Sequence, residues 1–162
     1  MMRKTVYFLL CIIGLLFLFL RLRWIGHLLS WDEAMALCTV RAFKAGGYDH
    51  FSNWFWRHPP LFSIIMLLLK PFDAGFAERT ELFVIFAAFV SAIFLFLLNK
   101  KVYGNETALW SVFFLAVMPG TVFYDTWIKS DCFVSLFGLI SILCFTNKKF
   151  FYSGLFLGLA FL

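Results

Sequence analysis

Charged residues are scarce in this chain of 162 residues: Asp, Glu, Lys and Arg make up 14% of it, against about 25% in a typical soluble domain. Hydrophobic residues make up 63%, which leaves too little polar surface to cover a water-soluble domain of this size. The composition therefore excludes a soluble globular domain, a disordered chain, a collagen-like chain and a small secreted scaffold. It predicts a membrane protein.

Cysteine shows no redox or metal-binding pattern. The four cysteines have no CxxC spacing, and three of them lie in apolar runs. Free cysteine in such surroundings behaves as a small hydrophobic residue. We therefore interpret all four as core or lipid-facing residues: Cys11, Cys38, Cys132 and Cys144.

Long apolar runs predict an all-α fold, a polytopic transmembrane helical protein with short juxtamembrane helices in its first outer loop. The first run follows Arg3 and Lys4, as in a secretory signal, but no small-x-small cleavage site comes after it. We expect an uncleaved span with Arg21 and Arg23 at its far end, both snorkelling to the interface. The predicted spans are residues 5–25, 82–99, 107–124, 131–146 and 150–162. The last is too short to cross a bilayer, so the chain is expected to stop in mid-helix.

The basic residues predict how these spans are oriented. Residues 61–69 form an apolar segment that is bracketed by prolines and is too short to cross a bilayer. If this segment stays outside, the N-terminal basic pair and the lysine pairs at 100–101 and 148–149 all lie on one side, which the positive-inside rule assigns to the cytoplasm. We expect a multi-pass protein of the cell membrane with a cytoplasmic N-terminus. The net charge of +5 then reports orientation, and no nucleic-acid partner is expected.

The outer loop, residues 26–81, is expected to hold two interfacial helices at about residues 31–45 and 60–70. Ser30 and Glu33 fit a capping box at the start of the first helix, where the hydroxyl and the carboxylate satisfy free backbone amides. Asp32 is favoured there by the helix dipole. A catalytic role stays open for both acids, since one can cap the helix while the other reacts.

The other polar clusters also fall in the outer loops, and this common side of the membrane indicates a site at the outer interface. Asp131 fits either an N-cap of the fourth span or a catalytic acid. Asp125 and Lys129 fit a surface ion pair at i, i+4 spacing. His58 precedes two prolines in a rigid stretch that suits a metal ligand or a phosphate partner, although a lone loop histidine is usually neither. Arg57 fits a lipid-headgroup anchor.

The order of these features resembles the integral-membrane GT-C glycosyltransferases. The closest branch is the one that includes protein O-mannosyltransferases and the lipid A aminoarabinose transferase. The resemblance rests on the acidic pair Asp32-Glu33 after the first span, the His-Pro-Pro-Leu stretch that begins at His58, and Asp131 at the fourth span. It covers the whole chain as the N-terminal part of a GT-C type membrane domain, because the family enzymes are much longer.

The resemblance implies an inverting transfer of a sugar on the extracytoplasmic side of the membrane. The donor would be a polyprenyl- or dolichyl-phosphate sugar, and the acceptor a hydroxyl of a glycan, lipid or protein. Asp32 would be the general base, Glu33 its support and Asp131 the second acid. The leaving lipid phosphate needs a divalent metal ion of unspecified identity or basic side chains, and His58 would be a metal ligand. The residues expected to contact substrate are Arg57, Lys129 and Tyr48.

A second hypothesis is a non-enzymatic multi-pass membrane protein, such as a transporter fragment or an assembly subunit, in which the acids only cap helices. Transporters place ionisable residues near the bilayer midplane, whereas the spans here are nearly free of charge. Under the first hypothesis, a chain that ends at Leu162 lacks the later spans that complete the donor groove. Activity of this chain on its own therefore stays an open question.

Overall fold

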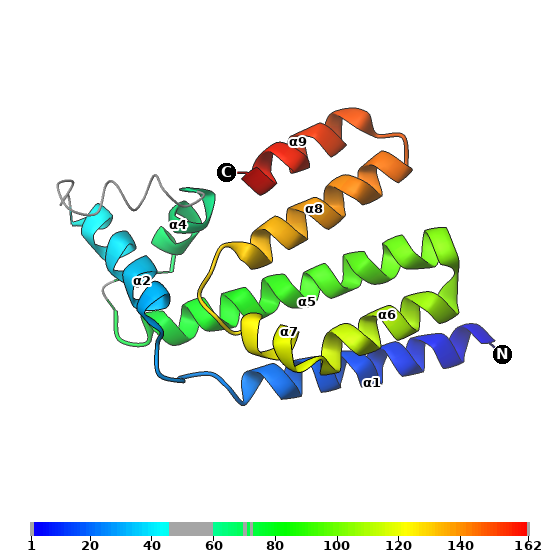
Figure 1. Cartoon of the computed structure of the whole chain (residues 1–162), viewed down its shortest axis with the longest axis horizontal. Coiled ribbons are helices and arrows are strands. Elements are labelled where there is room, and N and C mark those ends of the chain that lie inside the picture. Colours follow the sequence, from blue (N-terminus) through cyan, green and yellow to red (C-terminus); the bar gives the residue numbers. More distant parts are fainter. Residues whose placement is uncertain (1, 46–59, 70, 72, 162) are drawn as a thin grey trace.

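The computed structural model describes residues 2–45, 60–69, 71 and 73–161. Over these residues the chain forms eight helices and no strand (Figure 1), so the predicted all-α class is confirmed there. The helices are α1 (Met2–Leu22), α2 (Trp31–Lys44), α4 (Pro60–Leu67), α5 (Phe76–Tyr103), α6 (Asn105–Val117), α7 (Pro119–Tyr124), α8 (Asp131–Thr146) and α9 (Phe150–Phe161).

Two helices are long and apolar enough to cross a membrane. They are the segment Thr5–Leu22 of α1 and the 28-residue helix α5. Helices α6, α8 and α9 are also apolar, but they have 13, 16 and 12 residues. A crossing needs about 20 residues at a rise of about 1.5 Å each. Helix α4 has only eight residues, which is far short of that length.

Helix α5 is the central element of the bundle. It packs against α6 and α1 on one side and against α8 on the other, and α8 and α9 form an antiparallel hairpin (Figure 1). The core divides into two clusters of buried apolar side chains. The first joins α1, α5 and α6 through Ile13, Phe17, Ala88, Ala92, Phe96, Ala108, Val112 and Ala116. The second joins α2, α4, α5 and α8 through Leu37, Val40, Phe62, Met66, Phe76, Val84, Ala87, Ile128 and Phe133.

The two lysine-bearing turns lie at the same end of the bundle as the N-terminus (Figure 1). The α5–α6 turn passes through Gly104 with φ 93°, a left-handed conformation that favours glycine. The α8–α9 turn contains Lys148 with φ 59°. The two turns are in contact, because the Lys101 ammonium donates to the Thr146 carbonyl at 2.7 Å. This gathering of the lysine pairs at one end is the arrangement that the charge pattern predicts.

The helix predicted over residues 107–124 is interrupted in the structure. Helix α6 ends at Val117, Met118 adopts an extended conformation with ψ 120°, and α7 begins at Pro119. Proline has no N–H, so the carbonyl four residues earlier, that of Leu115, loses its intrahelical donor. The prediction of one continuous helix is therefore wrong, and the break leaves backbone acceptors that need partners from elsewhere.

Candidate functional site

The candidate site lies at the end of the bundle opposite the lysine turns. Helix α2, helix α4 and the loop between α7 and α8 meet there. Three side chains connect the end of α1 and the start of α2 to this loop: Arg21, Glu33 and Asp125.

Arg21, at the end of α1, binds the broken helix and the loop that follows it. Its guanidinium donates to the Asp125 carboxylate at 2.6 and 2.9 Å. It also donates to the carbonyls of Leu115 and Ala116, each at 3.1 Å, which are acceptors exposed by the break at Pro119. The side chain is fully buried. The prediction that Arg21 snorkels to the interface is therefore wrong, because the α6–α7 break offers it buried acceptors, whereas Arg23 is exposed as predicted.

Asp125 pairs with Arg21 rather than with Lys129. The predicted i, i+4 pair requires helical geometry between the two residues, but α7 ends at Tyr124 and residues 125–130 form turns and bends. Burial raises the pKa of Asp125, and the hydrogen bond and charge of Arg21 only partly oppose that shift. Asp125 thus acts as an anchor for the loop that carries Lys129 and Asp131.

Glu33 forms the predicted capping box and also binds the α7–α8 loop. Its carboxylate accepts from the Ser30 backbone N–H at 2.8 Å, and the Ser30 hydroxyl accepts from the Glu33 backbone N–H at 3.4 Å. The other carboxylate oxygen accepts from the backbone N–H of Ile128 at 3.0 Å. Burial opposes ionisation of Glu33, but these hydrogen bonds, with the nearby His27, lower its pKa overall. Glu33 therefore connects the start of α2 to the α7–α8 loop.

His27 lies between two buried carboxylates. Its Nε2 is 3.2 Å from a Glu33 oxygen, and its Nδ1 is 3.5 Å from a Glu81 oxygen and 3.0 Å from the Trp24 carbonyl. Glu81 also accepts from the Gly26 backbone N–H at 2.7 Å. Both ring nitrogens thus face acceptors. These contacts tie the linker between α1 and α2 to the first turns of α5.

A cavity of about 330 Å³ brings together two of the three residues predicted for catalysis, Asp32 and Asp131, whereas Glu33 does not line it. It is lined by Asp32 from α2, by Ser63 from α4, and by Lys129 and Asp131 from the loop and the start of α8. The Lys129 ammonium lies 3.3 Å from the Asp32 carboxylate, whose side chain remains 61% exposed. Asp32 and Asp131, which are 99 positions apart in the chain, therefore line the same cavity. Lys129 also lines it and lies beside Asp32.

Asp131 does not occupy the N-cap position. Ser130 is the N-cap of α8 and makes no side-chain capping bond, while Asp131 is the first helical residue and is exposed. Asp131 also lines a second cavity, of about 470 Å³, between α5, α6, α7 and α8. The walls of this cavity are mostly apolar, with hydroxyls from Ser91, Thr121 and Ser135. Asp131 therefore lies where a polar cavity meets a more apolar one.

Three predicted residues lie outside the described residues: Tyr48, Arg57 and His58. Within the described residues, no three His, Cys, Asp or Glu side chains are grouped closely enough to hold a metal ion. Asp32 and Asp131 supply carboxylates, but they do not form a metal site on their own.

Sequence reasoning missed several polar residues of this region. Ser63 and Thr39 line the cavity, and His27 lies between Glu33 and Glu81 and contacts both. Ser63 lies inside an apolar run, and His27 and Glu81 are separated by more than fifty residues. Only the packing of the α1–α2 linker against α5 brings His27 and Glu81 together, so no local pattern identifies them.

No family model, no curated protein and no solved structure matches this chain. Its function must therefore be inferred from the site.

The site can carry out proton transfer next to a bound anion. An exposed carboxylate is free to accept a proton, and a neighbouring ammonium can neutralise a phosphate. The exposed ion pair between Asp32 and Lys129 is worth at most about 1 kcal/mol, so an incoming anion exchanges it at little cost. The two side chains thus suit a reaction in which a hydroxyl loses a proton while a phosphate leaves.

Proposed function

We propose that this chain forms part of an inverting membrane glycosyltransferase of the GT-C type, which moves a sugar from a polyprenyl- or dolichyl-phosphate donor to an acceptor hydroxyl. The observation that carries the proposal is the shared cavity of Asp32, Lys129 and Asp131. It joins Asp32 of the acidic pair after the first helix to the acid at the start of α8, and these are two of the three features on which the resemblance to this family rests.

In the proposed reaction Asp32 is the general base. It removes the proton from the acceptor hydroxyl while the new bond forms between that oxygen and the anomeric carbon of the sugar. The bond from the anomeric carbon to the phosphate oxygen breaks on the opposite face, which inverts the configuration. Asp32 is suited to this role because its side chain is exposed to the cavity and has one close partner, Lys129, that a substrate can displace.

Lys129 takes the charge of the leaving phosphate. Its ammonium exchanges the Asp32 carboxylate for the phosphate oxygens, which also releases Asp32 to act as a base. Arg57 remains a proposed second phosphate contact, and Tyr48 a proposed substrate contact. Asp131 is the proposed second acid, at the junction with the 470 Å³ cavity, where the lipid-linked end of the donor would lie.

Glu33 is a positioning residue in this proposal. Both of its oxygens are engaged by backbone amides, and its side chain is buried, so it is not offered to a substrate. It lies in the first turn of α2, directly after Asp32, and its carboxylate accepts from the backbone N–H of Ile128, the residue before Lys129. Glu33 therefore sets the separation between the base and the cation.

The proposal is tested by replacing Asp32 with Asn in the protein expressed from its complete reading frame. Sugar transfer is measured in isolated membranes from a polyprenyl-phosphate donor that carries a radiolabelled sugar. We expect Asp32→Asn to lower transfer at least about 100-fold, the usual contribution of a general base. The matched control is Asp73→Asn, because Asp73 is exposed and does not line the cavity.

Retained transfer in Asp32→Asn, with normal membrane insertion, would contradict the proposal. A second candidate is a non-enzymatic multi-pass membrane protein. One observation favours it: Glu33 and Asp125, two of the acids at this end, have structural partners. In that case Asp32→Asn and Asp73→Asn behave alike in every transfer assay.

A further inference from the structure

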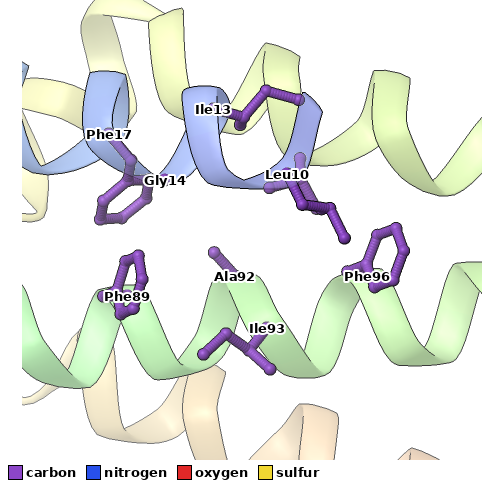
Figure 2. Close-up of a pocket in the computed structure, with 9 residues that line it drawn as sticks. Leu10, Ile13, Gly14, Phe17, Phe89, Ala92, Ile93 and Phe96 are labelled. Carbon is purple, nitrogen blue, oxygen red and sulfur yellow. The ribbon is translucent and has the colours of Figure 1, made fainter. Parts of the chain in front are cut away.

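A third cavity lies far from the carboxylates, between α1 and α5. Figure 2 shows Leu10, Ile13 and Gly14 of α1 facing Phe89, Ala92 and Phe96 of α5. The cavity measures about 150 Å³, and every side chain that lines it is aliphatic or aromatic. The cavity is open on one side, and because its lining offers water no hydrogen-bond partner, it suits an apolar group.

Gly14 keeps this cavity open on the α1 side. A Cβ atom at this position would lie 3.5 Å from the ring of Phe89, which is ordinary contact. A larger side chain at Gly14 would therefore occupy the space without a forced clash of the backbone. This makes Gly14 the position at which the cavity can be filled selectively.

The two ends of the cavity differ in charge. At one end the Arg21 guanidinium stacks on Phe17, 3.4 Å from the ring centroid, but this cation is buried and neutralised by Asp125. At the other end the Lys100 ammonium lies 5.8 Å from the ring centroid of Phe96, and Lys100 is exposed. An apolar cavity with an accessible cation at one end is complementary to an anionic lipid, whose acyl chain is apolar and whose headgroup is negatively charged.

The surroundings of Lys100 strengthen this polarity. Lys101 follows it directly, and the lysines of the α8–α9 turn lie at the same end of the bundle (Figure 1). Large aromatic side chains are exposed around these turns, including Tyr103, Phe145 and Phe150. Aromatic and basic residues together are typical of the interface between membrane and water.

We propose that this cavity is a binding site for an anionic phospholipid of the surrounding membrane. A segment of one acyl chain lies between α1 and α5, and the headgroup phosphate pairs with Lys100. Among the described residues these are the two helices long and apolar enough to cross a membrane, and in that placement lipid would lie next to the cavity. Lipid binding at this site requires no sugar donor or acceptor, so it can be tested independently of the transfer reaction.

The test uses the purified full chain in detergent micelles. Phosphatidylglycerol or phosphatidylcholine is added, and the melting temperature and native mass spectra report bound lipid. We expect phosphatidylglycerol to raise the melting temperature more than phosphatidylcholine does, because a ligand that binds only the folded state stabilises it. Lys100→Gln should weaken phosphatidylglycerol binding about five-fold, the effect of one basic residue near an anionic headgroup.

Two further variants sharpen the test. Gly14→Leu should reduce binding of the lipid, while Arg23→Gln, which removes an exposed cation at the other end of α1, should leave it unchanged. Equal binding of the two phospholipids, or unchanged binding in Lys100→Gln, would overturn the proposal. So would a polyprenyl phosphate that binds in a Lys100-dependent manner in preference to phosphatidylglycerol, because the site would then belong to the isoprenoid carrier.

Discussion

The guanidinium of Arg21 lies 2.6 Å from the carboxylate of Asp125, although the two residues are 104 positions apart in the chain. The same guanidinium satisfies two carbonyls freed by the break at Pro119. One side chain therefore closes the end of α1, compensates for the broken α6–α7 helix and anchors the loop that carries Lys129 and Asp131.

Replacing Arg21 with Met should destabilise the chain by about 3 kcal/mol. The change leaves Asp125 without its cation and removes a donor from the carbonyls of Leu115 and Ala116, of which Leu115 still accepts from the Thr121 hydroxyl. We expect a value at the lower end of the range for breaking a buried ion pair, because the Asp125 side chain is 23% exposed. Chemical denaturation in micelles measures the loss.

Arg23→Met is the control and should change stability by less than about 0.5 kcal/mol, since Arg23 is exposed. Adding Asp125→Asn to Arg21→Met should restore part of the loss, and a double variant as unstable as the sum of the single variants would contradict a direct pairing.

Glu33 should make stability depend on pH in the acidic range. Its pKa is lower in the folded state, so its contribution is complete above the ordinary glutamate pKa and is lost as the pH falls through the folded-state value. Glu33→Gln should therefore lower the melting temperature at pH 7 and have a smaller effect as the pH falls below about 4. The raised pKa of Asp125 has the opposite sign, but it is present in both proteins and cancels in the comparison.

The control for Glu33 is Glu106→Gln, at the opposite end of the bundle in the first turn of α6. Its effect on stability should be small, because Glu106 is exposed. A destabilisation of Glu33→Gln that is the same at all pH values would show that the carboxylate charge has no part in the contact with Ile128.

Replacing Lys148 with glycine should stabilise the folded chain. Its φ of 59° lies in the left-handed region, where a side chain costs about 1 kcal/mol. The next two hydrogen bonds, from Lys148 to Phe145 and from Lys149 to Cys144, close a Schellman motif, in which glycine is preferred. Lys148→Gly should raise stability by about 1 kcal/mol in thermal denaturation. Lys148→Ala removes the same charge but keeps the strain, so an equal gain in that variant would attribute the effect to charge.

Lys129 should affect the lipid-linked donor more than it affects folding. Under the proposed function, Lys129→Gln raises the KM for the donor about 10-fold, the effect of losing one charged hydrogen bond. Initial rates against donor concentration measure it. The melting temperature should hardly change, because the exposed contact with Asp32 contributes less than about 1 kcal/mol. Lys129→Arg keeps the positive charge and should retain most of the affinity, and an equal loss in both variants would argue against a phosphate contact.

The two ends of the bundle should lie on opposite sides of the membrane. In a variant without the four native cysteines, Lys129→Cys should react with a membrane-impermeant maleimide added to intact cells. Lys149→Cys should react only after the membrane is permeabilised, because it lies at the end that the positive-inside rule assigns to the cytoplasm. Labelling of both positions in intact cells would contradict the multi-pass arrangement.

The sequence by itself determined the all-helical class and the start of α2. That start, at Trp31, follows from the capping box of Ser30 and Glu33, whose contacts lie within four residues of one another. Interactions of this range are fixed once the helix forms, so local patterns are enough to predict them. The break at Pro119 is also local, and the prediction missed it by giving more weight to the continuous apolar run.

Only the tertiary structure decided which acids have partners and which line a cavity. The local alternatives for Asp125 and Asp131, an i, i+4 pair and an N-cap, were both replaced: Asp125 found Arg21, and Asp131 was left exposed beside Asp32 and Lys129. Glu33 acquired a second partner, Ile128, 95 positions away. Such contacts depend on how the helices pack and on where a helix breaks. The spacing of residues in the sequence does not reveal how the helices pack. The acids could therefore be assigned to one end of the molecule from the chain alone, but their division into anchors and candidate reactive groups came from packing.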